Sequence, residues 1–411
     1  MASIKSKFRP SALSDREGTI YYQIIHERRV RQLQSRHKIL TEEWDPRRST
    51  PIITPTNHPR HGKLSAIREA IRCDMERLAR IIRHLDSLGL PYSADDITDE
   101  FERYSTECTI VNYMQSMIAT LKLRNQFRTS ETYQATLNSF RKFLTETSVG
   151  HHASLPDDMM LDAITSETMQ TYEAYLKAKG NTPNTTSFYM RILRAVYNNA
   201  VERDAIVNRN PFRKVFTGVA KTVKRALPLA TVRKIRNLDL SSSPRTAYAR
   251  DMFMMSFYLR GMSFVDMAFL RKSDLINGHL TYRRRKTGQQ LHIAWTSEMQ
   301  TILDRYPTNP TSYLLPIITR ENCNQRNAYR SIAENINLHL KKIAAMVGVT
   351  TPLTLYVARH SWASAAKAKN IPLSVISECM GHDSETTTQI YLASLETSVV
   401  DRANALILSS L

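Results

Sequence analysis

Residues 356–361 read YVARHS and residues 380–391 read MGHDSETTTQIY, and the interpretation of the chain depends on these two segments. They contain Arg359, His382 and Tyr391, and Tyr391 follows His382 by nine residues. Taken singly, each feature has an ordinary structural explanation. A Gly-His-Asp-Ser step is typical of a helix boundary with a polar cap, an isolated arginine can form an ion pair at the edge of a core, and most tyrosines pack. Their meaning therefore depends on what else the chain carries.

Two further segments upstream add basic side chains. Residues 280–283 and 291–295 flank Lys286-Thr287-Gly288, which is a β-hairpin signature with the lysine at the turn. Earlier, the apolar run 252–259 ends in Arg260-Gly261-Met262-Ser263. A lysine in a turn is common in any protein, but four such segments in one half of the chain indicate a single composite site.

Together the four segments resemble the tyrosine recombinase family, the phage-type integrases, most closely those of Bacteroides-type mobile elements. The matching parts are Arg260–Ser263 for the first arginine box, Lys286 for the hairpin lysine, Arg359-His360 for the second arginine box, and Gly381-His382 with Tyr391 for the last box. Their order and spacing match the family. The segments in front of them resemble its arm-binding and core-binding modules, so the resemblance covers the whole chain.

The resemblance implies that Tyr391 attacks a DNA phosphodiester and becomes bonded to the 3′ phosphate. Arg359 would hold the non-bridging oxygens, because a guanidinium is always charged and matches phosphate with two parallel hydrogen bonds. His382 would donate to a phosphate oxygen, and Lys286 would protonate the leaving 5′ oxygen. Tyr356 stands where the family usually has a histidine; its phenol can reach the phosphate but is no base near neutral pH. Rejoining would need no ATP, metal or other cofactor.

The first arginine box departs further from the family pattern. Ser263 occupies the usual place of the arginine, and its neutral side chain cannot balance a developing phosphorane charge. We predict that Arg260, three residues earlier, supplies the missing guanidinium, and Arg250 is the alternative. The competing explanation is that Arg260 only forms an ion pair with Asp251 or Asp266.

The residue composition and hydrophobic periodicity along the sequence predict a multidomain, mainly α protein. Residues 1–58 are rich in β-branched and aromatic side chains and predict a small N-terminal β-sheet domain of the arm-type DNA-binding kind. Residues 59–105 predict a helical connector, and residues 106–217 predict a helical, SAM-like core-binding domain. Residues 218–411 predict the tyrosine-recombinase catalytic domain, which is mixed α with a small β-sheet.

The charge of the N-terminal stretch favours DNA as its ligand. Residues 1–60 hold 12 Lys or Arg against 6 Asp or Glu, a difference of +6. A basic β-ribbon is one shape that enters a DNA groove. A small sheet with a solvated charged face is the alternative explanation.

The whole chain of 411 residues carries a net charge of +19, which indicates a polyanionic partner. Its longest apolar run is too short for a membrane span, the N-terminus has no signal-peptide core, and the four cysteines form no metal-binding pair. We therefore expect a cytoplasmic, nucleoid-associated protein that binds double-stranded attachment-site DNA. The resemblance implies a tetramer on paired sites and a DNA-bending accessory protein from host or element.

A type IB topoisomerase shares the chemistry, but the N-terminal sheet and helical block argue against it. A DNA-binding regulator with impaired catalysis is the other alternative, because Ser263 and Tyr356 depart from the family. In the tail, apolar residues recur at helical spacing and predict docking on a neighbouring protomer, with packing on its own domain as the alternative. These tail residues are Leu395, Val399, Ala403, Leu406 and Ile407.

Overall fold

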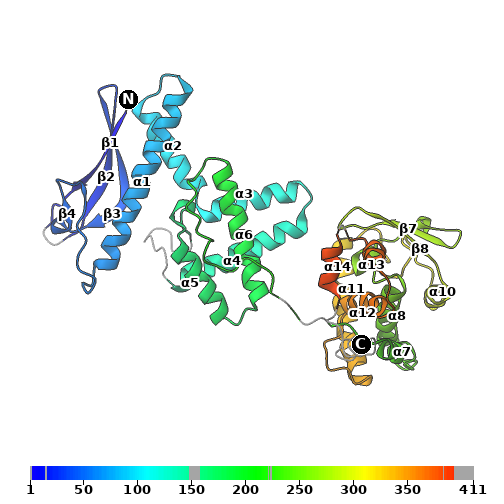
Figure 1. The fold of residues 1–411 in the computed structure, drawn as a ribbon. Helices are drawn as coiled ribbons and strands as arrows, with labels where there is room; N and C mark the ends of the chain where they lie inside the picture. Colours follow the sequence, from blue (N-terminus) through cyan, green and yellow to red (C-terminus); the bar gives the residue numbers. More distant parts are fainter. Residues whose placement is uncertain are drawn as a thin grey trace, which may run out of the picture. The chain divides into compact units, whose positions relative to one another are not determined.

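The computed structural model describes residues 2–13, 16–147, 158–220, 222, 225–382 and 384–392, except for the side chains of Ile390 and Tyr391. The chain forms two compact units, residues 1–220 and 221–411 (Figure 1). Helices dominate both, and each unit contains a small antiparallel sheet. The predicted fold class is therefore confirmed. The finer boundaries at 58, 105 and 217 stay predictions, and the apolar tail residues 395–407 lie outside the described residues.

The N-terminal sheet has two unlike faces. Its strands β1 (Ser3–Arg9), β2 (Gly18–His26) and β3 (Arg29–Ile39) pair antiparallel in that order. Along β2, buried and half-buried residues alternate, because successive side chains of a strand point to opposite faces. Ile20, Tyr22 and Ile24 form the buried face. Strand β1 was not expected from the sequence, because its few apolar residues alternate with lysines and an arginine.

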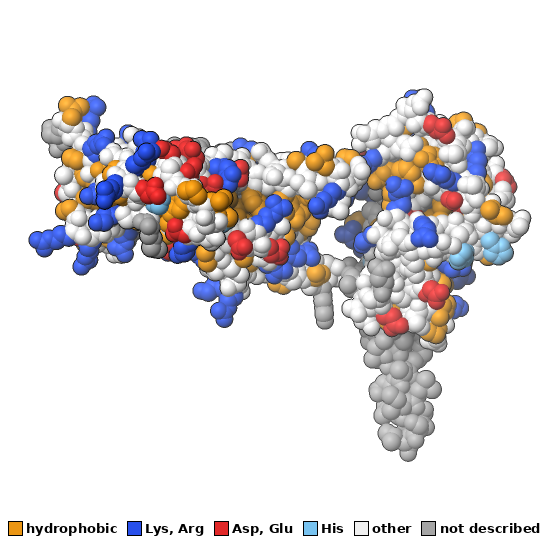
Figure 2. Space-filling view, turned by 90° about the horizontal axis from the view of Figure 1, so that it is seen from above, with side chains coloured by type: hydrophobic (Ala, Val, Ile, Leu, Met, Phe, Trp, Pro, Cys, Tyr) orange, Lys and Arg blue, Asp and Glu red, His pale blue; other side chains and the backbone are white. Residues whose placement is uncertain are grey.

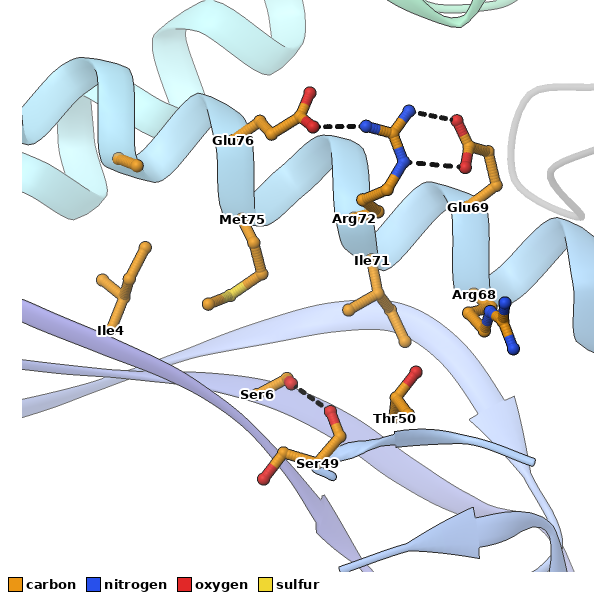
Figure 3. Close-up of a pocket in the computed structure, with 11 residues that line it drawn as sticks. Ile4, Ser6, Ser49, Thr50, Arg68, Glu69, Ile71, Arg72, Met75 and Glu76 are labelled. Atoms are coloured by element: carbon orange, nitrogen blue, oxygen red, sulfur yellow. Dashed lines mark hydrogen bonds and ion pairs between the residues drawn. The ribbon is translucent and has the colours of Figure 1, made fainter. Parts of the chain in front are cut away.

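Helix α1 (His61–Leu88) lies across the buried face of this sheet, and α2 (Ala94–Glu107) packs beside it. The 3₁₀ helix η1 (Thr41–Glu43) and the short strands β4 (Trp44–Asp45) and β5 (Thr50–Pro51) precede them. Ile71 and Met75 of α1 face the sheet across an open groove, while Arg72 pairs with Glu69 and Glu76 on the outer side (Figure 3). Helix α1 ends at the C-cap Gly89, which takes a left-handed φ of 65°.

Four helices and one 3₁₀ turn make up the rest of the first unit. They are α3 (Ile110–Leu123), α4 (Phe127–Thr147), η2 (Leu161–Ala163), α5 (Ser166–Ala178) and α6 (Pro183–Glu202). Threonine caps start α3, α5 and α6, and each hydroxyl accepts a backbone N–H three residues on. Phe140, Phe143 and Tyr172 pack ring against ring in the core of this helical block.

The second unit surrounds helix α8 (Pro244–Tyr258), whose Met252, Phe253 and Met255 are completely buried. Around it lie α7 (Leu229–Arg236), α9 (Phe264–Ala268), α10 (Ser297–Leu303), α11 (Gln325–Met346), α12 (Leu355–Ala368), α13 (Leu373–Met380) and α14 (Glu385–Tyr391). The sheet comprises β6 (Leu275–Ile276), β7 (His279–Arg283) and β8 (Gln290–Ala294), with η3 (Lys272–Asp274) before it. The predicted hairpin thus forms from β7 and β8. Within the described ranges, no helix has both the length and the apolar character that crossing a bilayer requires.

Candidate active site

Arg359 lies in the second turn of α12 with its side chain buried, only 3% exposed. Its Nη1 donates to the Gly261 carbonyl oxygen and its Nη2 donates to the Met380 carbonyl oxygen, both at 2.7 Å. The guanidinium therefore joins the loop after α8 to the end of α13. Because an arginine stays charged when buried, these contacts fix a positive charge at the point where the two loops meet.

His382 is held against Arg359 by the turn that ends α13. Gly381 takes a left-handed φ of 64° and directs the chain back, and His382 is 7% exposed. Its Nε2 lies 2.8 Å from Arg359 Nη2, and its Nδ1 lies 2.8 Å from Thr388 Oγ1 on α14. Arginine can only donate, so Nε2 accepts there and the ring proton belongs on Nδ1.

The surroundings of His382 keep its ring neutral. Burial lowers the pKa of His382, and the charges of Arg359, Arg284 and Lys286 lower it further, to about 4. The structure therefore brings together three basic side chains around His382, two of which, Arg359 and Lys286, were predicted from the sequence.

Tyr391 closes α14, which starts at the Ser384 cap and packs against α12 and α13. Thr388 of this helix is buried and bonded to His382. Position 391, three residues further, lies on the same face of the helix as position 388. The side chain of Tyr391 is outside the described residues, so its role as nucleophile stays a prediction.

The β7–β8 hairpin adds an arginine that was not predicted from the sequence. Leu280 and Tyr282 of β7 point into the core, and Arg284 continues this alternation with only 6% exposure. Its Nη1 donates to the Gly381 carbonyl oxygen. Lys286, by contrast, is exposed at the turn. Read alone, the run Arg283-Arg284-Arg285 suggests a solvated, basic face. The alternation of inward and outward side chains along the strand is the sequence signal that could have identified Arg284 as the inward-facing arginine.

Arg260 lies next to this site, and no carboxylate among the described residues forms an ion pair with it. Its Nη1 is 3.8 Å from Cys379 Sγ on α13, and within the described part of the chain neither Asp251 nor Asp266 pairs with it. The alternative explanation, in which Arg260 only forms an ion pair with Asp251 or Asp266, therefore disagrees with the structure. Arg250 instead bonds Asp251 at 2.9 Å and the Leu238 carbonyl oxygen at 2.6 Å. These bonds use Arg250 as a structural tie.

Ser263 and Tyr356, the two departures from the family pattern, have separate local explanations. Ser263 is the N-cap of α9, and its Oγ donates to Asp266 Oδ2 at 2.6 Å and accepts the Asp266 N–H. It therefore stabilises a helix start. Tyr356 is 50% exposed in the first turn of α12, and its ring meets the edge of His360 at 5.0 Å between centroids.

Comparisons with known proteins find matches in both units of the chain. Residues 109–218 match the phage integrase SAM-like domain, and residues 231–397 match the phage integrase family. The chain belongs to the phage integrase family of tyrosine recombinases. Relatives of this integrase include tyrosine recombinase XerD of Listeria monocytogenes, 24% identical over 236 residues that span 54% of this chain and 75% of XerD. Tyrosine recombinase XerA of Pyrococcus furiosus is 25% identical over 242 residues, 57% of this chain and 79% of XerA.

Solved structures show the same fold for this integrase. A lambda integrase dimer bound to a COC′ core site is 16% identical, with a TM-score of 0.53 over 90% of this chain and 91% of that chain. A lambda integrase tetramer bound to a Holliday junction gives a TM-score of 0.53 at 16% identity, over 86% and 94% of the two chains. The narrower resemblance to integrases of Bacteroides-type elements stays a prediction.

Proposed function

We propose that this integrase is a site-specific DNA recombinase that cuts and rejoins DNA through a 3′-phosphotyrosyl bond at Tyr391, and so integrates or excises a mobile element. One observation carries the proposal: buried Arg359 and neutral His382 lie 2.8 Å apart, and Thr388 ties His382 to the helix that ends in Tyr391. A pair of polar side chains buried in this way is what phosphoryl transfer requires, because its transition state is stabilised mainly by preorganised charge.

In the proposed cleavage step, the Tyr391 oxygen attacks the phosphorus and the bond to the 5′ oxygen breaks. The phenol proton passes to water, and Lys286 at the exposed turn of the hairpin donates a proton to the leaving 5′ oxygen. Arg359 binds non-bridging phosphate oxygens. To do so, it gives up hydrogen bonds that it makes to backbone carbonyl oxygens in the free protein. The reverse sequence, with another 5′ hydroxyl as nucleophile, rejoins the strand. The bond energy kept in the phosphotyrosine makes both steps independent of ATP.

His382 requires a change of protonation for its proposed role. In the structure its Nε2 carries no proton and accepts from Arg359. A phosphate arriving between the two side chains brings negative charge, which raises the pKa of the imidazole. Nε2 then takes up a proton and donates it in a hydrogen bond to a phosphate oxygen, while Nδ1 stays bonded to Thr388.

Two arginines qualify for the place that Ser263 leaves empty. We retain Arg260, which is adjacent to the Arg359 contact at Gly261. Arg284 is an equally placed candidate, because it bonds Gly381, the residue before His382, and is buried. Tyr356, on the exposed side of α12, contributes a hydroxyl to the DNA backbone in this proposal.

The open face of the N-terminal sheet is the proposed arm-type DNA surface of residues 1–58. None of its three strands contains Asp or Glu. The pairing of Lys5 with Gln23, and of Gln23 with Gln32, sets all three on this face. Arg9 stacks over Tyr21 at 5.3 Å and donates to Gln32 Oε1 at 2.8 Å. Amide and basic side chains on one uncovered sheet face suit a DNA groove.

The proposal extends to assembly. Lys and Arg side chains are prominent on both units in the face that Figure 2 shows, consistent with a net charge of +19. We propose that the helical block 106–217 and the catalytic unit bind core DNA, that four protomers assemble on paired sites, and that a DNA-bending protein assists. The site of action would be the bacterial nucleoid in the cytoplasm.

The decisive experiment uses a nicked suicide duplex built from the DNA that flanks the gene. Wild type should accumulate a covalent protein–DNA adduct, because the short cleaved strand diffuses away and prevents rejoining. Tyr391→Phe should form no adduct and should bind the duplex with unchanged affinity, because the substitution removes only one hydroxyl. Tyr92→Phe, which removes a hydroxyl bonded to Asp86 outside the catalytic unit, is the matched control and should still form adduct.

Two outcomes would change the proposal. Adduct formed by Tyr391→Phe would remove Tyr391 as nucleophile, and absence of adduct from wild type would favour the DNA-binding regulator. Strand exchange between two duplexes that share a core separates a recombinase from a topoisomerase, which only relaxes a supercoiled circle.

A further inference from the structure

Arg77 on α1 is a buried arginine of the first unit, only 6% exposed. Its Nε donates to Asp162 Oδ2 at 2.6 Å, Nη2 bonds the other oxygen of the same carboxylate, and Nη1 donates to Asp74 Oδ1 at 2.5 Å. Asp74 in turn accepts the Tyr22 hydroxyl of β2 at 2.6 Å. One buried chain of charged groups thus runs from the N-terminal sheet through α1 to the turn η2 of the helical block.

A second group of contacts lies beside this chain. The Tyr104 ring of α2 lies 5.8 Å from the Arg77 guanidinium and 5.6 Å from that of Arg80. The Tyr104 hydroxyl donates to the Ala205 carbonyl oxygen at 2.7 Å, and Arg80 donates to the same oxygen. The loop after α6 is thereby held by both α1 and α2.

Helix α1 is accordingly covered on two sides. Its apolar side chains, among them Ile71 and Met75, face the sheet (Figure 3). Its Arg77 and Arg80 face the helical block instead. Removing water from an ion pair is costly, so a buried pair resists separation only when the geometry is good and every remaining donor is bonded. All three guanidinium nitrogens of Arg77 donate to carboxylates, two of them to a residue 85 positions away.

We propose that Arg77 is a positioning residue that locks the N-terminal sheet, through α1, onto the helical block, so that the arm-binding and core-binding surfaces of one protomer keep a fixed relative angle. The DNA surfaces named here rest on the function proposed above; the lock itself does not.

The proposed lock is tested by measuring distances between the N-terminal sheet and the helical block in the full-length chain. Spin labels at Lys38→Cys on β3 and Ala174→Cys on α5 report the separation of sheet and helical block, and both positions are exposed. The background carries Cys323→Ser and Cys379→Ser; the other two cysteines are buried. Wild type should give one narrow distance distribution. Arg77→Met should give a distribution at least twice as broad, because Asp162 and Asp74 lose their shared counter-ion.

The matched control is Arg72→Met. Arg72 lies on the same helix and also pairs with two carboxylates, Glu69 and Glu76, but all three are exposed, so the distribution should stay narrow. A label pair inside the block, Leu123→Cys with Ala174→Cys, should stay narrow in every variant and shows that the block remains folded. Should Arg77→Met not fold, Asp162→Asn replaces it. Equal widths for wild type, the Arg77 variant and the Arg72 variant would overturn the proposal.

A functional measurement then asks whether the lock matters to DNA. Arm and core duplexes are recovered from random pools by binding to full-length wild type. In wild type, added arm duplex should change the rate of core cleavage at saturating core DNA by about fivefold or more. In Arg77→Met the arm duplex should bind equally well and leave that rate unchanged. If wild type forms no adduct, the proposed function fails while the distance result stands; if both proteins respond equally, the positioning role fails.

Discussion

Arg284 bonds the Gly381 carbonyl oxygen beside His382, and Arg260 lies 3.8 Å from Cys379 Sγ on α13. Neither occupies the usual place of the first-box arginine. Removing a charged interaction with the transition state costs about 100- to 1,000-fold in rate. We expect Arg284→Gln and Arg260→Gln to differ: substitution of the arginine that binds phosphate should slow cleavage by that factor with unchanged DNA affinity. Arg283→Gln is the matched control, because Arg283 adjoins Arg284 but points outward. Single-turnover cleavage of a suicide duplex measures the effect, and normal cleavage by both variants would mean that neither arginine binds the phosphate.

His382 makes the stability of the catalytic unit depend on pH. Its pKa is lowered from 6.5 to about 4, first by burial and then by Arg359, Arg284 and Lys286. Above pH 6.5 both folded and unfolded chains have a neutral ring, so the effect is absent. As the pH falls from 6.5 toward 4, the unfolded chain binds the proton first and stability decreases.

Comparison with His382→Gln separates the contribution of His382 to the pH dependence of stability from that of the other titratable groups. Between about pH 7 and pH 4.5, wild type should lose about 2 kcal/mol more free energy of unfolding than the variant does. Urea unfolding followed by tryptophan fluorescence measures the difference. Parallel pH profiles for the two proteins would contradict the assigned pKa shift.

At the scale of elements, the contact between α12 and the loop after α8 depends on Gly261. It has a φ of +72°, and a Cβ there would lie 2.7 Å from the Arg359 Cα. Gly278 has a similar φ of +75°, but a Cβ there would meet nothing within 4 Å. Comparing alanine substitutions at the two glycines therefore distinguishes the cost of a left-handed backbone conformation from the cost of a steric clash.

We expect Gly278→Ala to cost about 1–2 kcal/mol, the penalty of a left-handed residue. Gly261→Ala should cost more than this and should also reduce cleavage, because α12 must move and carries Arg359 with it. Thermal unfolding and suicide-duplex cleavage measure both effects. Equal stability and equal cleavage for the two variants would show that the close approach of Gly261 to α12 is unimportant.

For the molecule as a whole, positive charge has two distinct uses. Lysines on the open sheet face have no carboxylate in their strands. Lys142, Lys177 and Lys179, by contrast, form ion pairs with Glu146 or Glu173 on the helical block. In the proposed function we assign phosphate contacts to the first group and not to these three paired lysines.

Replacing Lys5, Lys7 and Lys38 by glutamine should therefore weaken DNA binding and make it less sensitive to salt. The slope of log K against log salt should decrease by about 0.9 for each phosphate that the variant no longer neutralises. The triple glutamine variant at Lys142, Lys177 and Lys179 removes the same charge and should retain the wild-type slope. Fluorescence anisotropy over a salt series measures both, and equal slopes would contradict the assigned arm surface.

Features whose signals are local could be predicted from the amino-acid sequence. The Gly-His-Asp-Ser step is typical of a helix boundary with a polar cap, and α13 ends at Gly381 while Ser384 caps α14. Lys286 lies at the predicted hairpin turn, and α1 ends at Gly89. Each depends on residues a few positions apart, for which backbone propensity and helical or strand periodicity suffice.

Features that depend on partners far away in the sequence could be identified only from the tertiary structure. That Arg284 meets the Gly381 carbonyl oxygen, 97 positions away, depends on where the end of α13 lies against the hairpin. That Arg77 pairs with Asp162, 85 positions away, likewise depends on how the chain folds back on itself. A charged side chain looks the same in sequence whether it is solvated or buried, because the difference lies in the low-dielectric surroundings that other segments provide.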